Sequence, residues 1–447
     1  MSKNIKKYAA VITLGCRLNQ TDTAIIFEEL KKAGFSIVKP DEEYPLSLVI
    51  INTCSVTSSA SQKSRQTVRS IKAKHQEAYI IVTGCSTETD KNWQKEKLVD
   101  KIIPNKDKTR VIEYIRNNPK FHMSENEGSM ENTDNKTESF TENSIGYYPF
   151  KQRANIKIQD GCDAFCTYCI VPYGRGKPRS REWNNAIFEF KELVKRGYKE
   201  IVLTGVNIAT YKDNSRDLSD LLQEFSSIDG DFRIRLGSTE PQFTMKGLIE
   251  TMASSDKICR FLHIPLQHGS NEILKSMGRN YARDEFKNFL FEAISRIPDI
   301  CVGSDIIVGF PGESNNHFFE CKEFIEQLPL AYLHVFKYSK RPGTPAALYK
   351  NQVHSKTAFE RHKTLTETAN KLSDLFMQKQ LGKTVKVLYE EIKNNDITGL
   401  TDNFIKVRVP LNSISVNPDA IPNNFIPTKL TGILKHRCMS GTLCRYN

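Results

Sequence analysis

Three cysteines in one short loop are the residues of this chain best suited to redox chemistry. Cys162, Cys166 and Cys169 form a C-x-x-x-C-x-x-C run. Three thiolates in a tight loop can hold three irons of a 4Fe–4S cube and leave the fourth iron open to a ligand. Zinc is the alternative, but a structural zinc site needs a fourth protein ligand, and none of the next twelve residues is Cys or His. The spacing therefore favours an iron–sulfur cluster with one open iron.

A second group of cysteines is defined by its position after predicted strands. Cys16, Cys54 and Cys85 each follow a short apolar run, and these runs are Ala9–Leu14, Ser47–Ile51 and Ala78–Thr83. The carboxyl ends of parallel strands meet at one edge of a sheet, so the three side chains are expected to converge there. A buried structural cysteine is the plainer interpretation of any one of them, but three at equivalent strand ends indicate a shared site.

The elements that position this second group alternate between strand and helix. Thr21–Ala33 has apolar residues at helical spacing with Gly34 directly after it, which predicts a helix. We therefore expect a small parallel α/β domain over residues 5–118. From Ser124 to Ser144 the chain is rich in Ser, Thr, Asn and Glu and has few apolar residues. Residues 119–147 are accordingly predicted to be a disordered acidic linker.

Beyond this segment, strand-like runs again alternate with helical segments. The six runs are Asn155–Gln159, Glu200–Thr204, Phe232–Leu236, Arg260–Pro265, Val302–Val308 and Tyr332–Tyr338. They predict an open or closed α/β barrel over residues 148–378, where chemistry gathers at the carboxyl ends of the strands. Residues 381–446 hold strand-like runs around a segment rich in Pro and Asn, which predicts a small β-barrel. The expected fold class is α/β with an all-β C-terminal part.

The composition restricts the class of protein. The 447 residues include 64 Lys and Arg against 52 Asp and Glu, and the net charge of +12 favours a polyanionic partner such as nucleic acid. No apolar run approaches the roughly 18 residues that a membrane-spanning helix needs. The N-terminal residues lack the apolar core of a signal peptide, so a cytoplasmic protein with no membrane partner is expected. In such a chain, grouped cysteines more often bind metal or do chemistry than form disulfides.

The cysteine pattern and five further motifs resemble the radical S-adenosylmethionine (SAM) methylthiotransferase family. The first triad resembles the cluster loop of radical SAM enzymes in general, and the second resembles the auxiliary-cluster ligands of this family. The motifs lie at or just past barrel strands, at Leu203–Asn207, Ser238–Pro241, His263–Gln267, Ser304–Glu313 and Tyr338–Ala346. The resemblance covers almost the whole chain. It implies an N-terminal cluster domain, a radical SAM barrel like part of a TIM barrel, and a C-terminal TRAM-like β-barrel.

The resemblance also implies the cofactors and the residues that hold them. Two 4Fe–4S clusters are expected: a radical cluster on the catalytic residues Cys162, Cys166 and Cys169, and an auxiliary cluster on Cys16, Cys54 and Cys85. SAM is expected at the open iron, with contacts from Tyr168, Gly205, Asn207, Glu240 and Gln267. In the family, one SAM methylates a sulfur on the auxiliary cluster. Another yields the 5′-deoxyadenosyl radical that takes the hydrogen from C2 of an adenine.

The substrate that the resemblance implies is tRNA. The residues around Cys16 and Cys54 most resemble the branch that acts on N6-threonylcarbamoyladenosine at position 37, within the anticodon stem-loop. Two alternatives within the family are the isopentenyladenosine branch and the branch that modifies an aspartate of a ribosomal protein. A distant alternative is a non-catalytic RNA-binding protein whose cysteines hold zinc. A monomer is expected, and the sequence does not identify the electron donor or the sulfur source.

Two groups of basic residues also favour RNA as the partner. Arg65, Arg69 and Lys72 recur at helical spacing and share one face of a helix. A second group follows the radical-cluster cysteines at alternate positions and comprises Arg175, Lys177, Arg179 and Arg181. Either group could equally be an ordinary solvated face. An anticodon loop offers unpaired bases for recognition, and the C-terminal β-barrel resembles oligonucleotide-binding barrels, so we expect it to anchor the RNA.

Overall fold

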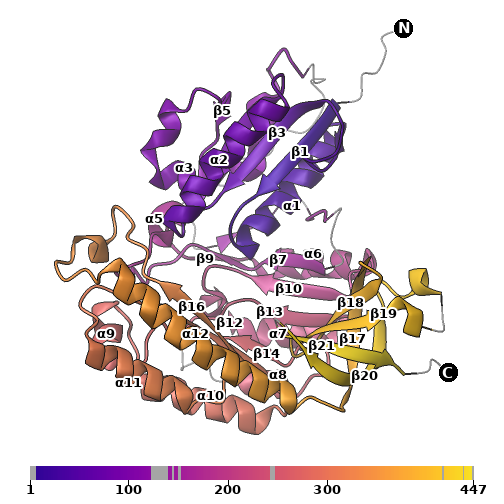
Figure 1. Ribbon diagram of the computed structural model, residues 1–447. Coiled ribbons are helices and arrows are strands. Elements are labelled where there is room, and N and C mark those ends of the chain that lie inside the picture. Colours follow the sequence, from indigo (N-terminus) through magenta and orange to yellow (C-terminus); the bar gives the residue numbers. More distant parts are fainter. Residues whose placement is uncertain are drawn as a thin grey trace.

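The structure, a computed structural model, describes residues 7–121, 139–142, 145–148, 153–241, 247–414, 417–435 and 437–444. The chain forms three parts (Figure 1): a helix-flanked N-terminal sheet, a central barrel below it in this view, and a small C-terminal β-barrel beside the central one. None of the helices in the described ranges is long and apolar enough to cross a membrane.

The N-terminal part is a parallel sheet in the order β2-β1-β3-β4-β5. Its strands are β1 (Lys7–Thr13), β2 (Phe35–Ile37), β3 (Leu46–Thr53), β4 (Tyr79–Gly84) and β5 (Lys101–Ile102). Its helices are α1 (Arg17–Lys32), α2 (Ser58–Lys74), α3 (Cys85–Thr89) and α4 (Val111–Ile115). Strand β3 is buried on both faces: Leu48 and Ile50 join one apolar cluster, and Val49 and Ile51 join the other. Burial on both faces explains why this strand is an unbroken apolar run.

The predicted strands before the N-terminal cysteines are confirmed, with small shifts at their ends. The helix predicted over Thr21–Ala33 begins earlier, because α1 starts at Arg17, directly after Cys16. Its first turns bury the polar residues Asn19 and Asp22. The apolar periodicity therefore begins after the helix does.

The described ends of the segment predicted to be a disordered linker, residues 119–147, are packed. Phe121 is fully buried in the core of the N-terminal part, and Ser139–Phe140 forms strand β6. Glu142 forms an ion pair with buried Lys157. Single side chains thus fix the ends of a segment whose average composition predicts disorder. Residues 122–138 and 143–144 lie outside the described residues.

The central part contains the six predicted parallel strands. They are β7 (Arg153–Lys157), β10 (Glu200–Thr204), β13 (Arg233–Leu236), β14 (Phe261–His263), β15 (Cys301–Val308) and β16 (Tyr332–Lys337). They form two three-stranded sheets, β13-β10-β7 and β14-β15-β16, which are joined by a bridge between Ser238 and His263. Among the described residues β7 and β16 do not pair, so the barrel is open along one side.

Helices cover the outside of this barrel (Figure 1). The main ones are α6 (Trp183–Lys195), α7 (Leu218–Ser227), α8 (Leu248–Ala253), α10 (Arg283–Arg296), α11 (Asn315–Glu326) and α12 (Ser355–Gln378). Shorter elements are β8 (Gln159–Asp160), α5 (Val171–Arg175), β9 (Arg179–Arg181), β11 (Lys212–Asp213), β12 (Arg216–Asp217) and α9 (Asn271–Ser276). Along β15, Val302, Ile306 and Val308 join the apolar core shared with the helices. The alternate face, which carries Asp305, therefore lines the barrel interior.

The C-terminal part is a closed barrel in the order β17-β18-β19-β21-β20. Its strands are β17 (Thr384–Lys393), β18 (Asp396–Thr401), β19 (Lys406–Pro410), β20 (Phe425–Leu434) and β21 (Cys438–Leu443). The turn between β18 and β19 docks on the central barrel. Arg235 of β13 donates to the main-chain oxygens of Thr401 (2.9 Å) and Asp402 (2.8 Å). The Asp402 carboxylate pairs with Arg260 at 2.6 Å, so the two barrels share buried polar contacts.

Candidate active site

The loop of the first cysteine triad leaves the barrel directly after β7 and β8. Gly161 has a φ of +78°, and a Cβ there would overlap the main-chain carbonyl of Lys177, so the turn requires glycine. Further along, the Cys169 amide donates to the Cys166 carbonyl at 2.9 Å. The main chain of the loop is thus held in place by the protein itself.

The three thiols of this loop lie close enough to affect one another's ionisation. Burial, together with the nearby charges of Cys166 and Cys162, raises the pKa of the Cys169 thiol to about 12. Burial also raises the pKa of Cys162. Thiols with raised pKa values ionise only when a cation stabilises the thiolates, as metal binding does. Three thiols gathered in one short loop are a donor set that fits a metal centre.

The sulfur atoms of each triad are not spaced as around a single zinc ion. Tetrahedral zinc, with Zn–S bonds of about 2.3 Å, brings its sulfur ligands to about 3.8 Å from one another. In the part of the chain that the structure describes, neither cysteine triad is among the groups whose metal-binding atoms all lie within 4.8 Å of one another. Within the described residues, the sulfur atoms of each triad are therefore more widely spaced than the ligands of one tetrahedral zinc ion.

Buried oxygens without partners lie among the residues predicted to contact SAM. Within the described ranges, neither the Asn207 Oδ1 nor the Thr239 Oγ1, beside Glu240, has a hydrogen-bond partner. The Gln159 side chain accepts from the amides of Val206 (3.0 Å) and Asn207 (2.8 Å) and holds the turn after β10. Buried polar atoms are nearly always paired in folded proteins, so these oxygens mark where a polar ligand fits.

Glu240, which is predicted to accept a hydrogen bond from SAM, already has a protein partner. Arg279 forms a close ion pair with Glu240 and donates from Nη1 to the Sγ of Cys166 at 3.2 Å. Arg279 lies between α9 and α10, outside every motif that the sequence analysis identified. Its contacts reach back to residues far earlier in the chain, so no local pattern signals its role. The arginine connects the radical-cluster loop to the predicted SAM site.

The other predicted SAM contacts occupy tight positions around the same end of the barrel. A Cβ at Gly205 would lie 2.9 Å from the main-chain oxygen of Gln159. Gln267 is buried with a φ of +70°, and its amide donates to the Asp305 carbonyl at 2.8 Å. Tyr168 packs against a small apolar cluster. The fold thus brings the five predicted residues to the end of the barrel that carries the first triad.

The second triad lies at one edge of the N-terminal sheet. Cys16 directly precedes α1, Cys54 follows β3, and Cys85 is the first residue of α3, directly after β4. Burial, aided by the nearby Cys16 and Cys85, raises the pKa of Cys54 to about 11. A Cβ at Gly15 would overlap the Cys54 side chain, so the close approach of the first two strand ends requires glycine. The three thiols are neighbours and form a second candidate metal centre.

A buried ion network joins the two triads. Arg175, six residues beyond Cys169, donates to the carboxylate of Asp160 at 2.9 Å and to the Oδ1 of Asn19 at 2.7 Å. It also contacts Asp22 of α1 at 3.3 Å. Burial alone would raise the pKa of Asp22, but the surrounding cations outweigh burial and hold that pKa well below its usual range. The network fixes the N-terminal sheet, and the second triad with it, against the barrel.

The basic residues expected to face RNA are mostly engaged within the protein. The ion pairs on α2 are Arg65–Asp90, Arg69–Glu96 and Lys72–Asp100. Arg175 belongs to the buried network, and Arg181 pairs with buried Glu189. Arg175 and Arg181 are buried and cannot face RNA, whereas the Arg69 side chain on α2 stays 66% exposed beside its ion pair. Lys177 and Arg179 line a cleft of about 900 Å³ between the N-terminal part and the barrel.

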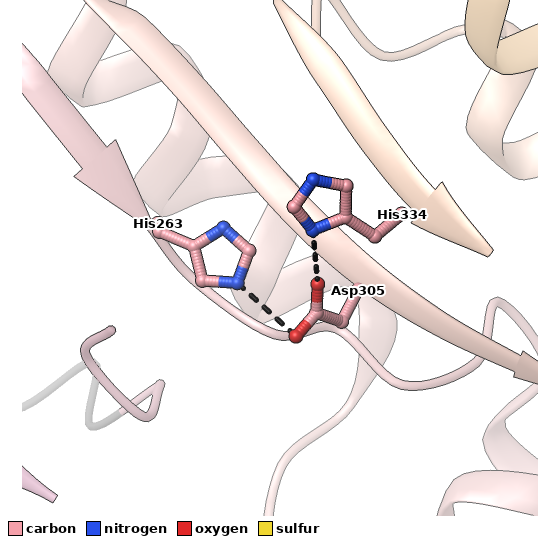
Figure 2. A group of neighbouring side chains, drawn as sticks. All are labelled: His263, Asp305 and His334. Atoms are coloured by element: carbon pink, nitrogen blue, oxygen red, sulfur yellow. Dashed lines mark hydrogen bonds and ion pairs between the residues drawn. The ribbon is translucent and has the colours of Figure 1, made fainter. Parts of the chain in front are cut away.

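A further polar group, not singled out from the sequence, lies inside the barrel. His263, Asp305 and His334 come from β14, β15 and β16 and point toward one another (Figure 2). The Asp305 carboxylate lies 3.1 Å from the Nε2 of His263 and 3.2 Å from the Nδ1 of His334. Burial alone would raise the pKa of Asp305, but hydrogen bonds from the two histidines hold it at about 2. The carboxylate is therefore ionised and fixes both rings.

Three comparisons relate this chain to known proteins. Residues 156–325 match the radical SAM superfamily, and residues 8–104 match the uncharacterized protein family UPF0004. The chain is 36% identical to threonylcarbamoyladenosine tRNA methylthiotransferase MtaB of Chlamydia pneumoniae, over 92% of this chain and 94% of that protein. It is 35% identical to the MtaB protein of Bacillus subtilis (strain 168), over 88% of each chain.

Among solved structures, the radical SAM methyltransferase TsrM from Kitasatospora setae, with cobalamin and a [4Fe–4S] cluster bound, has a TM-score of 0.55. It is 14% identical and covers 77% of this chain and 74% of its own, so the likeness concerns the fold alone. The family matches and the full-length relatives agree with the geometry of the first triad. This chain therefore belongs to the radical SAM tRNA methylthiotransferase family, whose chemistry uses SAM and a 4Fe–4S cluster.

Proposed function

We propose that this enzyme adds a methylthio group at C2 of N6-threonylcarbamoyladenosine at position 37 of tRNA, beside the anticodon. The observation that carries the proposal is the pair of cysteine triads that one buried ion network holds in a fixed relation. Transfer of a methylthio group needs both a site that activates the substrate and a site that supplies the group. Similarity to relatives of that name over most of the chain supports the choice of substrate.

We assign the radical cluster and SAM to the triad of Cys162, Cys166 and Cys169, and a second 4Fe–4S cluster to the other triad. When bound, these groups supply the radical chemistry that removes the C2 hydrogen and the methylthio group that replaces it. The C2 hydrogen of adenine is not acidic, so a base among the side chains could not remove it. The chain's own task is to bind the cofactors and to position the base between them.

Particular residues suit the binding part of this task. Asn207 and Thr239 offer buried oxygens to the hydroxyl and amine groups of SAM. Arg279 donates to the sulfur of Cys166 and holds Glu240, so it orients the cysteine loop relative to the SAM site. The narrow turn at Gly205 lets the main chain approach a ligand closely. These roles are part of the proposal.

We further propose that a single chain binds the anticodon stem-loop at the cleft beside the radical-cluster loop. Tyr173 lines this cleft and is 48% exposed, and its ring centre lies 5.9 Å from that of Phe165, which is 56% exposed. Exposed aromatic rings are the usual platforms for unpaired RNA bases. Lys177 and Arg179 line the same cleft and suit the phosphate backbone. The C-terminal β-barrel, with its resemblance to oligonucleotide-binding barrels, is proposed as a second anchor.

The test is an anaerobic reaction of the reconstituted enzyme with SAM, dithionite and a synthetic anticodon stem-loop, analysed by mass spectrometry of the nucleosides. We expect the 2-methylthio product from RNA that carries N6-threonylcarbamoyladenosine. Product only from RNA that carries isopentenyladenosine would assign the enzyme to the isopentenyladenosine branch of the family. Product from neither RNA, with modification of a ribosomal-protein aspartate, would favour the protein-modifying branch. Zinc in place of iron would favour a non-catalytic RNA-binding protein.

A further inference from the structure

Two arginines from opposite ends of the chain, Arg17 and Arg437, lie close together at the central barrel. The place where they meet the rings of Phe404 and Tyr332 is called the barrel floor. Arg17 directly follows Cys16, and Arg437 directly precedes β21 of the C-terminal barrel. Their guanidinium carbons lie 6.0 Å and 5.9 Å from the centre of the same ring, that of Phe404. Arg437 also lies 4.0 Å from the centre of the Tyr332 ring of β16. All three parts of the molecule therefore contribute to one place.

Neither arginine pairs with a carboxylate in the ranges that the structure describes. The nearby acidic side chains are already engaged: Glu200 by Arg235 at 2.8 Å, and Asp402 by Arg260 at 2.6 Å. Both unpaired guanidinium groups are half-buried. Positive charges that are partly removed from water and have no counter-ion are unfavourable, so this floor favours an anion from outside the chain.

The wall above the floor adds further polar groups. The Tyr332 hydroxyl lies 2.7 Å from the Nδ1 of His263, and the Tyr332 ring centre lies 5.1 Å from that of His334 (Figure 2 shows both histidines). Asp305 is engaged by both histidines, which leaves the other nitrogen of half-exposed His334 available to a ligand. Two guanidinium groups and an imidazole therefore line one side of the barrel interior.

We propose that this floor binds the carboxylate of the threonylcarbamoyl group on N6 of the substrate adenine. The inference rests on the proposed function. In adenine, N1 lies between C2 and C6, and C6 carries N6, so C2 and the N6 substituent share one edge of the base. Arg17 directly follows Cys16 and extends to within 6.0 Å of the Phe404 ring, so a base whose C2 faces the cluster on Cys16 has an N6 substituent that can reach Arg17. The planar fork of an arginine matches a carboxylate through two hydrogen bonds. The site selects an acidic N6 substituent over an apolar one.

A phosphate of the RNA backbone offers the same oxyanion chemistry. The carboxylate fits better because the floor lies inside the barrel, next to the buried rings of Phe261 and Tyr332. A single flexible substituent of an inserted base can reach such a place. The backbone of a loop stays outside, where most phosphate contacts are made. The two sources are distinguished by changing the substituent and leaving the backbone intact.

The experiment compares two anticodon stem-loops with the reconstituted full-length enzyme. One carries N6-threonylcarbamoyladenosine, and in the other the threonyl carboxylate is converted to the neutral amide. Equilibrium dissociation constants and single-turnover rates are measured for wild type, Arg437→Gln, Arg437→Lys and Arg296→Gln. Arg296 is an exposed arginine on α10 with a loose ion pair to Glu250, so its variant is the matched control. Iron content and circular dichroism show whether each variant is folded.

For each RNA, the single-turnover rate constant is divided by the dissociation constant. We expect this ratio to be higher for the acid RNA than for the amide RNA by about 30-fold or more, both in the wild type and in the Arg296→Gln control. Arg437→Gln should lose that preference with little effect on the amide RNA, and Arg437→Lys should retain part of it. Equal ratios for the two RNAs in the wild type would overturn the proposal. An equal decrease of the ratio for both RNAs in Arg437→Gln would also overturn it. Absence of any methylthio product with the wild type would instead reject the proposed function, and the dissociation constants would still test the site.

Discussion

At the scale of single residues, Arg279 shows how a side chain can act on the radical cluster without binding it. It donates to the sulfur of Cys166 and is neutralised by Glu240. A hydrogen bond to a cluster sulfur stabilises the more negative, reduced state, so it raises the reduction potential. Arg279 is therefore a positioning residue for the cysteine loop and the group that the loop holds.

Arg279→Met should lower the reduction potential of the radical cluster and slow the formation of 5′-deoxyadenosine on the order of 10- to 100-fold. The measurement is a redox titration followed by electron paramagnetic resonance, with the Cys85→Ala background to leave one cluster. Arg296→Met, which removes an exposed ion pair with Glu250, is the control. A potential equal to that of the wild type would show that the contact with Cys166 is only structural.

The Asp305 carboxylate makes stability depend on pH in a defined direction. Its pKa in the folded protein is about 2, below the usual value near 3.8, so its ionised form stabilises the fold above about pH 4. That contribution is lost as the pH falls from about 4 to about 2. Asp305→Asn should therefore lower the urea midpoint at pH 7, and the two proteins should converge toward pH 2. A constant difference across this range would contradict the assignment.

The sequence predicts the six cysteines because three share one short loop and three each follow an apolar strand, whereas their supporting residues come from distant positions. Arg175 contacts Asp22 across 153 positions of sequence, and Arg279 contacts Cys166 across 113. No periodicity or motif encodes such contacts. Arg181, predicted to face RNA, is instead buried and paired with Glu189 only eight positions away, because an alternating basic pattern does not distinguish a buried ion pair from a solvated face.

At the scale of elements, the strand–helix alternation of the first two parts was predictable, and several elements of the C-terminal part were not. All six barrel strands were expected near the places where the structure has them, although β7 and β13 carry charged residues among their apolar ones. By contrast, helix α12 buries only one face, and it was not identified from the sequence. Strands β18 and β21 contain Thr, Gly and Ser, so they do not form apolar runs that would identify them as strands. These missed elements include the two strands of the C-terminal barrel that flank β19.

The docking of the C-terminal barrel is expected to stabilise the central barrel. Asp402→Asn removes the charge that pairs with Arg260 and should lower the free energy of unfolding by about 1 to 3 kcal/mol. Urea unfolding followed by tryptophan fluorescence measures this change. Asp396→Asn, which affects the more exposed pair with Arg408 inside the small barrel, should cost less. Equal effects of the two variants would contradict a special role for the interface.

At the scale of the whole molecule, the net charge of +12 should make tRNA binding strongly dependent on salt. Each phosphate contact releases counter-ions, so the logarithm of the affinity should fall linearly with the logarithm of the salt concentration. Fluorescence anisotropy with a labelled stem-loop measures the slope. Lys177→Gln, in the cleft, should make the slope shallower by about one unit. A slope near zero for the wild type would mean that base contacts alone provide the affinity.

The central claim is that two separate cysteine triads do two different parts of one reaction. Cys85 lies in the N-terminal part and Cys166 in the central barrel, so loss of each should have its own signature. Cys166→Ala should abolish both 5′-deoxyadenosine and methylthio product, because the SAM-binding centre is lost. Cys444→Ala, a cysteine outside both triads, should behave as the wild type does.

The most direct measurement is an anaerobic turnover of Cys85→Ala with SAM, dithionite and the threonylcarbamoyladenosine stem-loop, in which 5′-deoxyadenosine and the 2-methylthio nucleoside are both quantified. We expect that 5′-deoxyadenosine still forms, that no methylthio product appears, and that iron falls from about eight to about four per chain. Methylthio product at the wild-type rate would contradict it, because Cys85 would then be an ordinary core thiol.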